Sequence, residues 1–451
     1  MSFDPTLAAI RFGTGLSPSV APPSDVAEML YRLGGPDRIA RAYPQPGWDQ
    51  KIGNAVAWVR LRRARKDGGQ PAEDAFRAHN RAMTEAHHAD LGRAFARAMG
   101  TEDGFRERLA WFWADHFAVA NGQGFLRRTV AGYHEDAIRP HIAGRFEDLL
   151  TAAVTHPAMV AYLDQRGSTG PNSPQGRRGR GLNENLAREL LELHTLGVGA
   201  AYGQSDVRQL AELLSGLSIT KAGQKTFQPN RAEPGPEEVL GRSYGGGPAD
   251  PEHIRAVLRD LAVHPETANH ICRKLAVHFV SDTPEPDLVA SMVARWAETE
   301  GDLMAVYAAL LDHPAAWSKD LVKVRPPFEF IAAAGRALGI GDGLEGAGIR
   351  TIRDAFFRPL SLMGQRWQHP PGPDGWPEDA RAWITPQGLS ARIEWAMRAP
   401  SEVPDLPDPR AFVDVALADL ASPRTRFAAQ AAEDRAAGIG LVLSAPDFQR
   451  R

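Results

Sequence analysis

The segment 182–197 concentrates side chains that could do chemistry. It reads Leu-Asn-Glu-Asn-Leu-Ala-Arg-Glu-Leu-Leu-Glu-Leu-His-Thr-Leu-Gly, so carboxylates, carboxamides, an arginine and a histidine lie in one short stretch. Carboxylates and imidazole nitrogens can transfer protons, and they also bind zinc, iron or manganese. We therefore take Glu189, Glu192 and His194 as candidate catalytic residues, and Glu189 and Glu192 also as candidate metal ligands.

The same segment has the pattern of a helix with two faces. A loop rich in Gly, Pro, Ser and Arg precedes it, and Gly197 ends it, since glycine often closes helices. At about 100° per residue, one face is apolar and consists of Leu186, Leu190 and Leu193. The opposite face is polar and consists of Glu184, Arg188, Glu192 and Thr195, with Asn185 and Glu189 on its flank. Asn183 and His194 project into the apolar side.

The spacing in this helix disfavours a metal site built from it alone. The Glu-x-x-His pattern of di-iron helical bundles is absent. Glu189 and His194 lie roughly 140° apart on the wheel, so both cannot easily reach one ion. A divalent metal ion, the cofactor that these residue types allow, needs ligands from other segments, and we take His116 and Asp164 as candidates.

A metal-free site is the alternative. Glu184, Arg188 and Glu192 are spaced for a ladder of ion pairs, which contributes little if exposed. Buried beneath the loop at 165–181, the ladder could hold an acid–base carboxylate with a shifted pKa, and Arg188, Asn183, Asn185 and His156 are further candidate site residues. Otherwise the segment is a salt-bridged helix whose His194 caps a neighbouring element.

A second helix, expected at 104–120, carries His116, our fourth candidate catalytic residue. The helix is apolar nearly all round, which predicts a central, buried position. Asp115 and His116 need partners there, because a lone buried charge costs several kcal/mol. Either they satisfy the end of a neighbouring helix, or His116 is a ligand or acid–base group of an internal site. His156 and Asp164, from a short helix expected nearby, could join it.

The helix start and stop signals along the chain predict a mainly α fold. Prolines at first turns, Ser or Asp caps and terminal glycines divide it into many helices. We expect a multi-helix body with orthogonal or bundle-like packing, long loops and at most a small β-hairpin. The expected organisation is an N-terminal helical body at 1–220, an irregular or hairpin connection at 221–250, and a C-terminal helical region at 251–451.

Two long loops need an explanation. The loop at 165–181 is either mobile or a lid, and its arginines at 177–180 could meet an anionic ligand, although a solvated loop is favoured. The segment 363–377 carries Trp367, Trp376 and several prolines, so it cannot be a regular helix. A structural loop clamped to the core is favoured there, and a ligand-facing rim is the alternative.

Composition excludes several classes of protein. The formal charge of −3 gives no electrostatic reason to expect nucleic acid as a partner. The single cysteine, Cys272, rules out an internal disulfide and a cysteine-based zinc cluster, and its apolar surroundings predict an inert buried thiol. No apolar run approaches the ~20 residues of a membrane span, and no ordinary signal peptide is evident, so we expect a cytoplasmic protein.

Several segments together resemble a known family. The strongest match is 183–197, and the others are 113–119, 139–141, 156–164, 273–280, the loop at 363–376 and 446–448. Together they resemble the bacterial domain-of-unknown-function family DUF1800 over nearly the whole chain. The resemblance implies a mostly helical protein without an established activity. Members of the family are often exported and encoded beside sulfatase-like proteins, so a sulfatase-like partner is implied, whereas this chain lacks an evident export signal.

Two hypotheses for the function follow. The first is an enzyme or binding protein with a polar or metal-binding site between helices. The second is a non-catalytic helical scaffold that works with a partner such as the sulfatase-like protein. The absence of a Gly-x-Ser-x-Gly elbow, a complete phosphate loop and a His-Glu-x-x-His motif favours the second.

Overall fold

The computed structural model describes residues 2–344 and 346–451, and it is mainly α-helical, as expected. The α-helices of the first half are α1 (Pro5–Leu7), α2 (Val26–Gly34), α3 (Arg38–Ala42), α4 (Trp48–Ala64), α5 (Gly69–Gly100), α6 (Gly104–His116), α7 (Val130–Tyr133), α8 (Phe146–Val154), α9 (Pro157–Tyr162), α10 (Asn185–Glu189) and α11 (Gln204–Leu214). Those of the second half are α12 (Pro251–Ala262), α13 (Pro265–Phe279), α14 (Pro286–Thr299), α15 (Leu303–Asp312), α16 (Pro327–Ala337), α17 (Ile349–Ile352), α18 (Arg358–Leu362), α19 (Ala380–Trp383), α20 (Pro386–Arg398), α21 (Pro409–Leu417), α22 (Pro423–Gln430), α23 (Arg435–Ser444) and α24 (Pro446–Gln449). Four π-helical turns interrupt or extend them: η1 (Ala8–Phe12), η3 (His134–Ile138), η7 (Leu190–His194) and η10 (Arg353–Phe357).

In the described ranges, the β-strands form two short antiparallel hairpins between α11 and α12. Strand β1 (Leu217–Ile219) pairs with β2 (Lys225–Phe227), and Leu217 lies opposite Phe227. Strand β3 (Pro236–Val239) pairs with β4 (Arg242–Gly245), and β3 also packs on α11. The first hairpin begins before the expected connection at 221–250 and the second lies within it, so the structure has two hairpins where at most one was expected.

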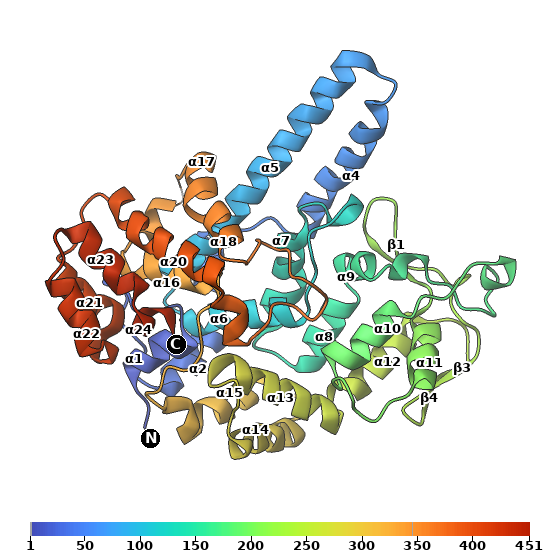
Figure 1. Cartoon of the computed structure of the whole chain (residues 1–451). Helices are drawn as coiled ribbons and strands as arrows, with labels where there is room; N and C mark the ends of the chain where they lie inside the picture. Colours follow the sequence, from blue (N-terminus) through green and yellow to red (C-terminus); the bar gives the residue numbers. More distant parts are fainter. Residues whose placement is uncertain (1, 345) are drawn as a thin grey trace.

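Two helices form the centre of the molecule, and their sequences explain why. Every residue of α16 is buried, in keeping with a sequence that is apolar on all sides except for Glu329 and Arg336. Helix α6 is largely buried as well, as its pattern predicts. Figure 1 shows α6 between the C-terminal helices α20–α24 and the group of α8 to α13, while α4 and α5 project away as a long hairpin.

The apolar core is divided between two main clusters. The larger one joins N-terminal helices to α12–α15, from Leu7 to Trp317. The second joins part of α5 to the helices from α16 onward. Helices α12–α15 thus share a core with the N-terminal helices, whereas the division at 220 and 250 stays a prediction.

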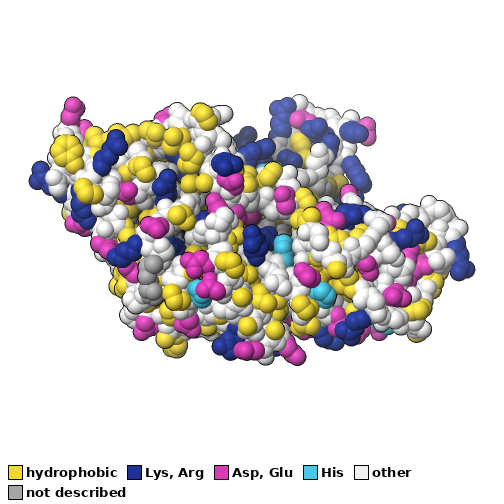
Figure 2. All heavy atoms as spheres, turned by 60° about the horizontal axis from the view of Figure 1, so that its bottom comes forward, with side chains coloured by type: hydrophobic (Ala, Val, Ile, Leu, Met, Phe, Trp, Pro, Cys, Tyr) yellow, Lys and Arg dark blue, Asp and Glu magenta, His cyan; other side chains and the backbone are white. Residues whose placement is uncertain are grey.

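The surface features bear on the expected partners. None of the helices in the described ranges is both long enough and apolar enough to cross a bilayer. The loop at 165–181 packs on Asn230 and Arg231 through backbone hydrogen bonds, while Arg177, Arg178 and Arg180 are exposed. Figure 2 shows basic and acidic side chains interspersed over one face, which offers no continuous basic patch for nucleic acid.

Candidate functional site

The candidate helix at 182–197 consists of α10 followed directly by the π-turn η7. As expected, Arg188 pairs with Glu184 and with Glu192, each at 3.3 Å between nitrogen and oxygen. These side chains are 28–39% exposed, so water screens the ladder and it contributes little to stability. Burial and the neighbouring Glu192 raise the pKa of the half-buried Glu189.

The π-turn shifts the phase of this helix, and two placements expected from a uniform helix are wrong. A π-turn closes its hydrogen bonds from i to i+5, so the 100° spacing fails between Leu190 and His194. Leu193, expected in the apolar face, is only half-buried, and Leu191 is fully buried instead. Thr195, expected on the polar face, is buried, and its hydroxyl donates to the Leu190 carbonyl at 2.6 Å.

His116 and His194 meet in the interior, with ring centres 6.2 Å apart. The Nε2 of His116 lies 3.2 Å from the carbonyl oxygen of His194, which can only accept, so the ring proton is assigned to Nε2. The lone pair on Nδ1 then faces Nζ of Lys274 at 3.1 Å. Burial, with Lys274 and His194, lowers the pKa of His116 well below its ordinary value, so the ring is neutral near pH 7.

His194 itself is buried without hydrogen-bond partners. Within the described part of the chain, neither of its ring nitrogens has one. Burial lowers the pKa of His194 to about 3, so this ring is neutral too. The expected cap of a neighbouring element by His194 is therefore not formed.

The remaining predicted residues serve local structure. Nδ1 of His156 accepts from the Ala158 amide at 3.1 Å and so caps α9, and burial lowers the pKa of His156 to about 3. Asp164 is exposed, and Asn183 donates to its carbonyl at 3.2 Å. The side-chain oxygen of Asn183 accepts from the exposed Asn185 at 2.9 Å, at the start of α10.

The four residues proposed as metal ligands do not form a cluster. Across residues 2–344 and 346–451, no group of three or more His, Cys, Asp or Glu side chains is arranged to hold a metal ion. His116 has both ring nitrogens engaged, Glu192 pairs with Arg188, and Asp164 is exposed. A bound divalent metal ion stays a prediction, and the described ranges contain no group of side chains arranged to bind it.

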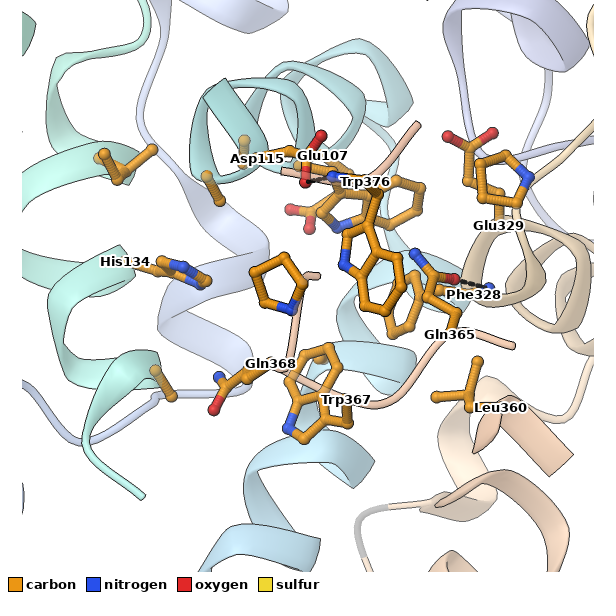
Figure 3. A pocket seen from close by; sticks show the side chains of 18 of the residues that line it. Glu107, Asp115, His134, Phe328, Glu329, Leu360, Gln365, Trp367, Gln368 and Trp376 are labelled. Atoms are coloured by element: carbon orange, nitrogen blue, oxygen red, sulfur yellow. Dashed lines mark hydrogen bonds between the residues drawn. The ribbon is translucent and has the colours of Figure 1, made fainter. Parts of the chain in front are cut away.

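The structure brings together a different site, between α5, α6, α16 and the segment 363–378. A cavity of about 200 Å³ lies there. Its aromatic wall consists of Trp111, Phe328, Trp367, Trp376 and Trp383. Phe328 stacks on Trp367 with ring centres 5.5 Å apart, and Trp111 meets Phe328 edge-on at 5.0 Å. Figure 3 shows Trp376, Trp367 and Phe328 around this space, which we call the aromatic cavity.

The segment 363–378 is clamped to the core, as favoured from the sequence, and it also lines the cavity, whereas a ligand-facing role stays a prediction. The side-chain oxygen of Gln365 accepts from the Phe328 amide at 2.7 Å, as the dashed line in Figure 3 marks. The carbonyl of Gln368 accepts from the Asn121 amide at 2.8 Å. These bonds hold the loop against both α16 and the chain that follows α6.

A glycine allows the loop to touch α6. Gly375 has φ +82°, a left-handed conformation that glycine adopts without cost. A Cβ at this position would lie 2.6 Å from the carbonyl oxygen of Asp115. The close approach lets the amide of Trp376 donate to a carboxyl oxygen of Asp115 at 2.8 Å. This contact supplies the partner that Asp115 was expected to need.

Asp115 is the titratable group at the centre of the site. Burial raises the pKa of Asp115 to about 7, against the opposing effects of the Trp376 amide and Lys274. The carboxyl therefore exchanges its proton near neutral pH, as an acid–base group must. It lines the aromatic cavity and also a second cavity of about 350 Å³.

The second cavity, which we call the polar cavity, adjoins the aromatic cavity and shares Asp115, Trp376, Pro377 and Glu378 with it. It is lined by Asp115, His116, Lys274, Asp374 and Glu378, together with Phe112 and residues of the loop. Carboxylates and a lysine thus face one volume from α6, α13 and the loop. Trp376 and Asp115 belong to the walls of both cavities.

Glu378 anchors the end of the loop in a buried charge network. Nδ1 of His278 donates to Glu378 at 2.5 Å, and Nε2 of His278 accepts from Arg108 at 3.0 Å. Lys323 also pairs with Glu378, at 2.9 Å. Burial alone would raise the pKa of Glu378, but these neighbours hold it well below its ordinary value. Burial lowers the pKa of His278 to about 4, which fits a neutral ring with both nitrogens satisfied.

Sequence reasoning missed two members of this site, Lys274 and Glu378. Lys274 sits in an ordinary amphipathic helix, and Glu378 follows the tryptophan loop without a motif around it. The available signals were indirect. Asp115 and His116 needed buried partners, and the aromatics of the loop needed a surface to pack on.

Comparison with known proteins places almost the whole chain in one sequence family. The model of the family described as protein of unknown function (DUF1800) matches residues 11–450. No curated protein and no solved structure matches the chain.

Proposed function

We propose that this chain, which belongs to the family described as protein of unknown function (DUF1800), binds a small uncharged organic molecule in its aromatic cavity. The family description assigns no activity, so the proposal rests on the site. The observation that carries it is a cavity of about 200 Å³ that combines several aromatic walls with the carboxyl group of Asp115. Cavities with mostly apolar walls and a few polar groups are where proteins bind small molecules.

The charges at the wall favour an uncharged ligand. Arg97 pairs with Glu135 at 2.7 Å, and Arg139 pairs with Glu107, so these charges compensate one another. The tryptophan and phenylalanine faces offer a large apolar contact area to a ring or chain of the ligand. Asp115, partly protonated near pH 7, can donate a hydrogen bond to a carbonyl, ether or hydroxyl oxygen. It can also act as the acid–base group of a reaction.

Fluorescence of a neutral probe tests this proposal. N-phenyl-1-naphthylamine fluoresces more strongly in apolar surroundings, and we expect saturable binding to the purified protein. The substitution Trp111→Leu removes one aromatic wall, and we expect about twofold to tenfold weaker binding, because an aromatic contact contributes about 0.5–1.5 kcal/mol.

The matched control is Phe427→Leu, since Phe427 is 69% exposed on α22 and does not line the cavity. It should leave binding unchanged, and circular dichroism should show that both variants fold. Absence of saturable binding, or equal binding by the wild type and Trp111→Leu, would refute the proposal.

Other inferences stay predictions. A sulfatase-like partner and a bacterial source rest on the family resemblance. A cytoplasmic location rests on the sequence of the first residues, and a divalent metal ion rests on residue types. A non-catalytic scaffold remains the alternative function, and it predicts that no small molecule binds either cavity.

A further inference from the structure

Lys274 is half-buried and has an unusual environment for such a lysine. The two other lysines with little exposure pair with carboxylates: Lys51 with Asp90 at 2.5 Å, and Lys323 with Glu378 at 2.9 Å. Lys274 forms no such ion pair with any residue in the described ranges. The hydrogen-bond partner that the structure gives its Nζ is Nδ1 of His116, at 3.1 Å.

This partner supplies no counter-charge to the amine. His116 is neutral and offers a lone pair, so it can accept a hydrogen bond but cannot balance a positive charge. A buried charge without a counter-charge is costly, and burial lowers the pKa of Lys274. Asp115, Glu378 and Asp374 act in the opposite direction on the pKa of Lys274, but the effect of burial is larger.

The polar cavity gives the amine both space and an acid. Lys274 lines this volume of about 350 Å³ together with Asp115. Uncharged lysine amines in partly buried sites attack carbonyl carbons and form Schiff bases. Asp115 can supply the proton that such a reaction needs, because its carboxyl exchanges a proton near pH 7.

We propose that Lys274 is a nucleophile that condenses with an uncharged aldehyde or ketone in the polar cavity. The amine nitrogen bonds to the carbonyl carbon, and one amine proton moves to the oxygen, which gives a carbinolamine. Asp115 then donates a proton to this hydroxyl group, the carbon–oxygen bond breaks, and water leaves. The products are a protonated Schiff base on Lys274, the Asp115 carboxylate and one water molecule, without any change of oxidation state.

The wall of the cavity selects against anionic carbonyl compounds. Asp374 and Glu378 add two carboxylates to that of Asp115, whereas Lys274 is the one basic side chain that lines the cavity in the described ranges. Like charges repel more strongly in a partly buried site than in water. An aldehyde that carries a carboxylate should therefore react less well than an uncharged one.

Reductive trapping with propanal tests the proposal. The purified full chain is treated near pH 7 with limiting propanal and sodium cyanoborohydride, which reduces a Schiff base to a stable propylamine. Peptide mass spectrometry then follows the modification of each lysine. We expect Lys274 to react severalfold faster than the exposed Lys221, since burial lowers the pKa of Lys274 and so leaves more of its amine uncharged.

Three comparisons sharpen the test. Protein unfolded in urea should lose the preference for Lys274. Glyoxylate, an anionic aldehyde, should show a smaller preference than propanal. The substitution Asp115→Asn should slow the reaction at Lys274, because it removes the acid. It should leave the reaction at Lys221 unchanged, because Lys221 is exposed and does not depend on Asp115.

Modification of Lys274 no faster than that of Lys221 in the folded protein would overturn the proposal. An equal preference in folded and unfolded protein would do the same. Either result leaves probe binding in the aromatic cavity unaffected, because the two tests use different cavities, probes and wild-type readouts. Failure of one proposal is thus distinguishable from failure of the other.

Discussion

The substitution Asp115→Asn should stabilise the protein, and the gain should depend on pH. Asparagine keeps a side-chain oxygen that can accept from the Trp376 amide, but it cannot ionise. In the folded protein the pKa of Asp115 is raised from the ordinary 3.8 to about 7. The unfolded chain therefore releases this proton near pH 4, and the folded chain releases it only near pH 7.

The sign and the size follow from this difference. Between about pH 4 and pH 7 the unfolded state binds fewer protons at Asp115 than the folded state, so the free energy of unfolding falls as pH rises. A shift of about three units at 1.36 kcal/mol each gives a loss of about 4 kcal/mol above pH 7. Asp115 is only half-buried, so contact with solvent reduces this penalty, and we expect Asp115→Asn to gain about 2–4 kcal/mol at pH 8 and little at pH 4.

Urea unfolding followed by tryptophan fluorescence measures the effect at about pH 4 and about pH 8. The quantity of interest is the difference between Asp115→Asn and the wild type at each pH, because the other titrating groups are common to both proteins. Asp374→Asn is the control, since Asp374 lines the same polar cavity but is exposed. An equal difference for Asp115→Asn at the two pH values would refute the assignment of a raised pKa to this carboxyl.

Three further predictions concern the framework around the site. Gly375→Ala should destabilise the protein by at least about 1–2 kcal/mol in urea unfolding, because of its φ of +82° and the 2.6 Å approach of its Cβ to the α6 carbonyl. Lys323→Met should cost about 2–4 kcal/mol in the same assay, since Glu378 loses a buried partner, and a normal stability would show that the pair is dispensable. Cys272 is buried in α13, and burial raises the pKa of its thiol, so dithionitrobenzoate should react with it only as urea unfolds the protein.

The fold could be predicted from local patterns because local patterns determine helices. Prolines, caps and glycines mark helix ends through short-range effects, and the all-round apolar character of α6 correctly predicts its burial. The π-turn η7 could not be foreseen in this way. A helical wheel assumes one angular spacing throughout. The π-turn changes this spacing, so that Leu191 rather than Leu193 lies in the buried face.

The site was harder to predict because its contacts join distant parts of the chain. The Trp376 amide and the Asp115 carboxyl are separated by 261 positions, and Lys274 and His116 by 158. No spacing rule relates such residues. The sequence predicts only that Asp115 and His116 have polar partners, because both lie in a helix that is otherwise apolar and buried.

The wall that Asp115 and Trp376 share has a thermodynamic consequence. A molecule in the aromatic cavity and a molecule in the polar cavity can both touch Asp115 and Trp376, because both residues line both cavities. If a molecule in one cavity changes the affinity of the other cavity for its own ligand by some factor, that ligand changes the affinity of the first cavity by the same factor. The proton on Asp115 is a third ligand in this linkage. Two molecules that each bind better to the protonated carboxyl therefore also strengthen each other's binding. The effect is largest above the pH at which the empty protein releases that proton.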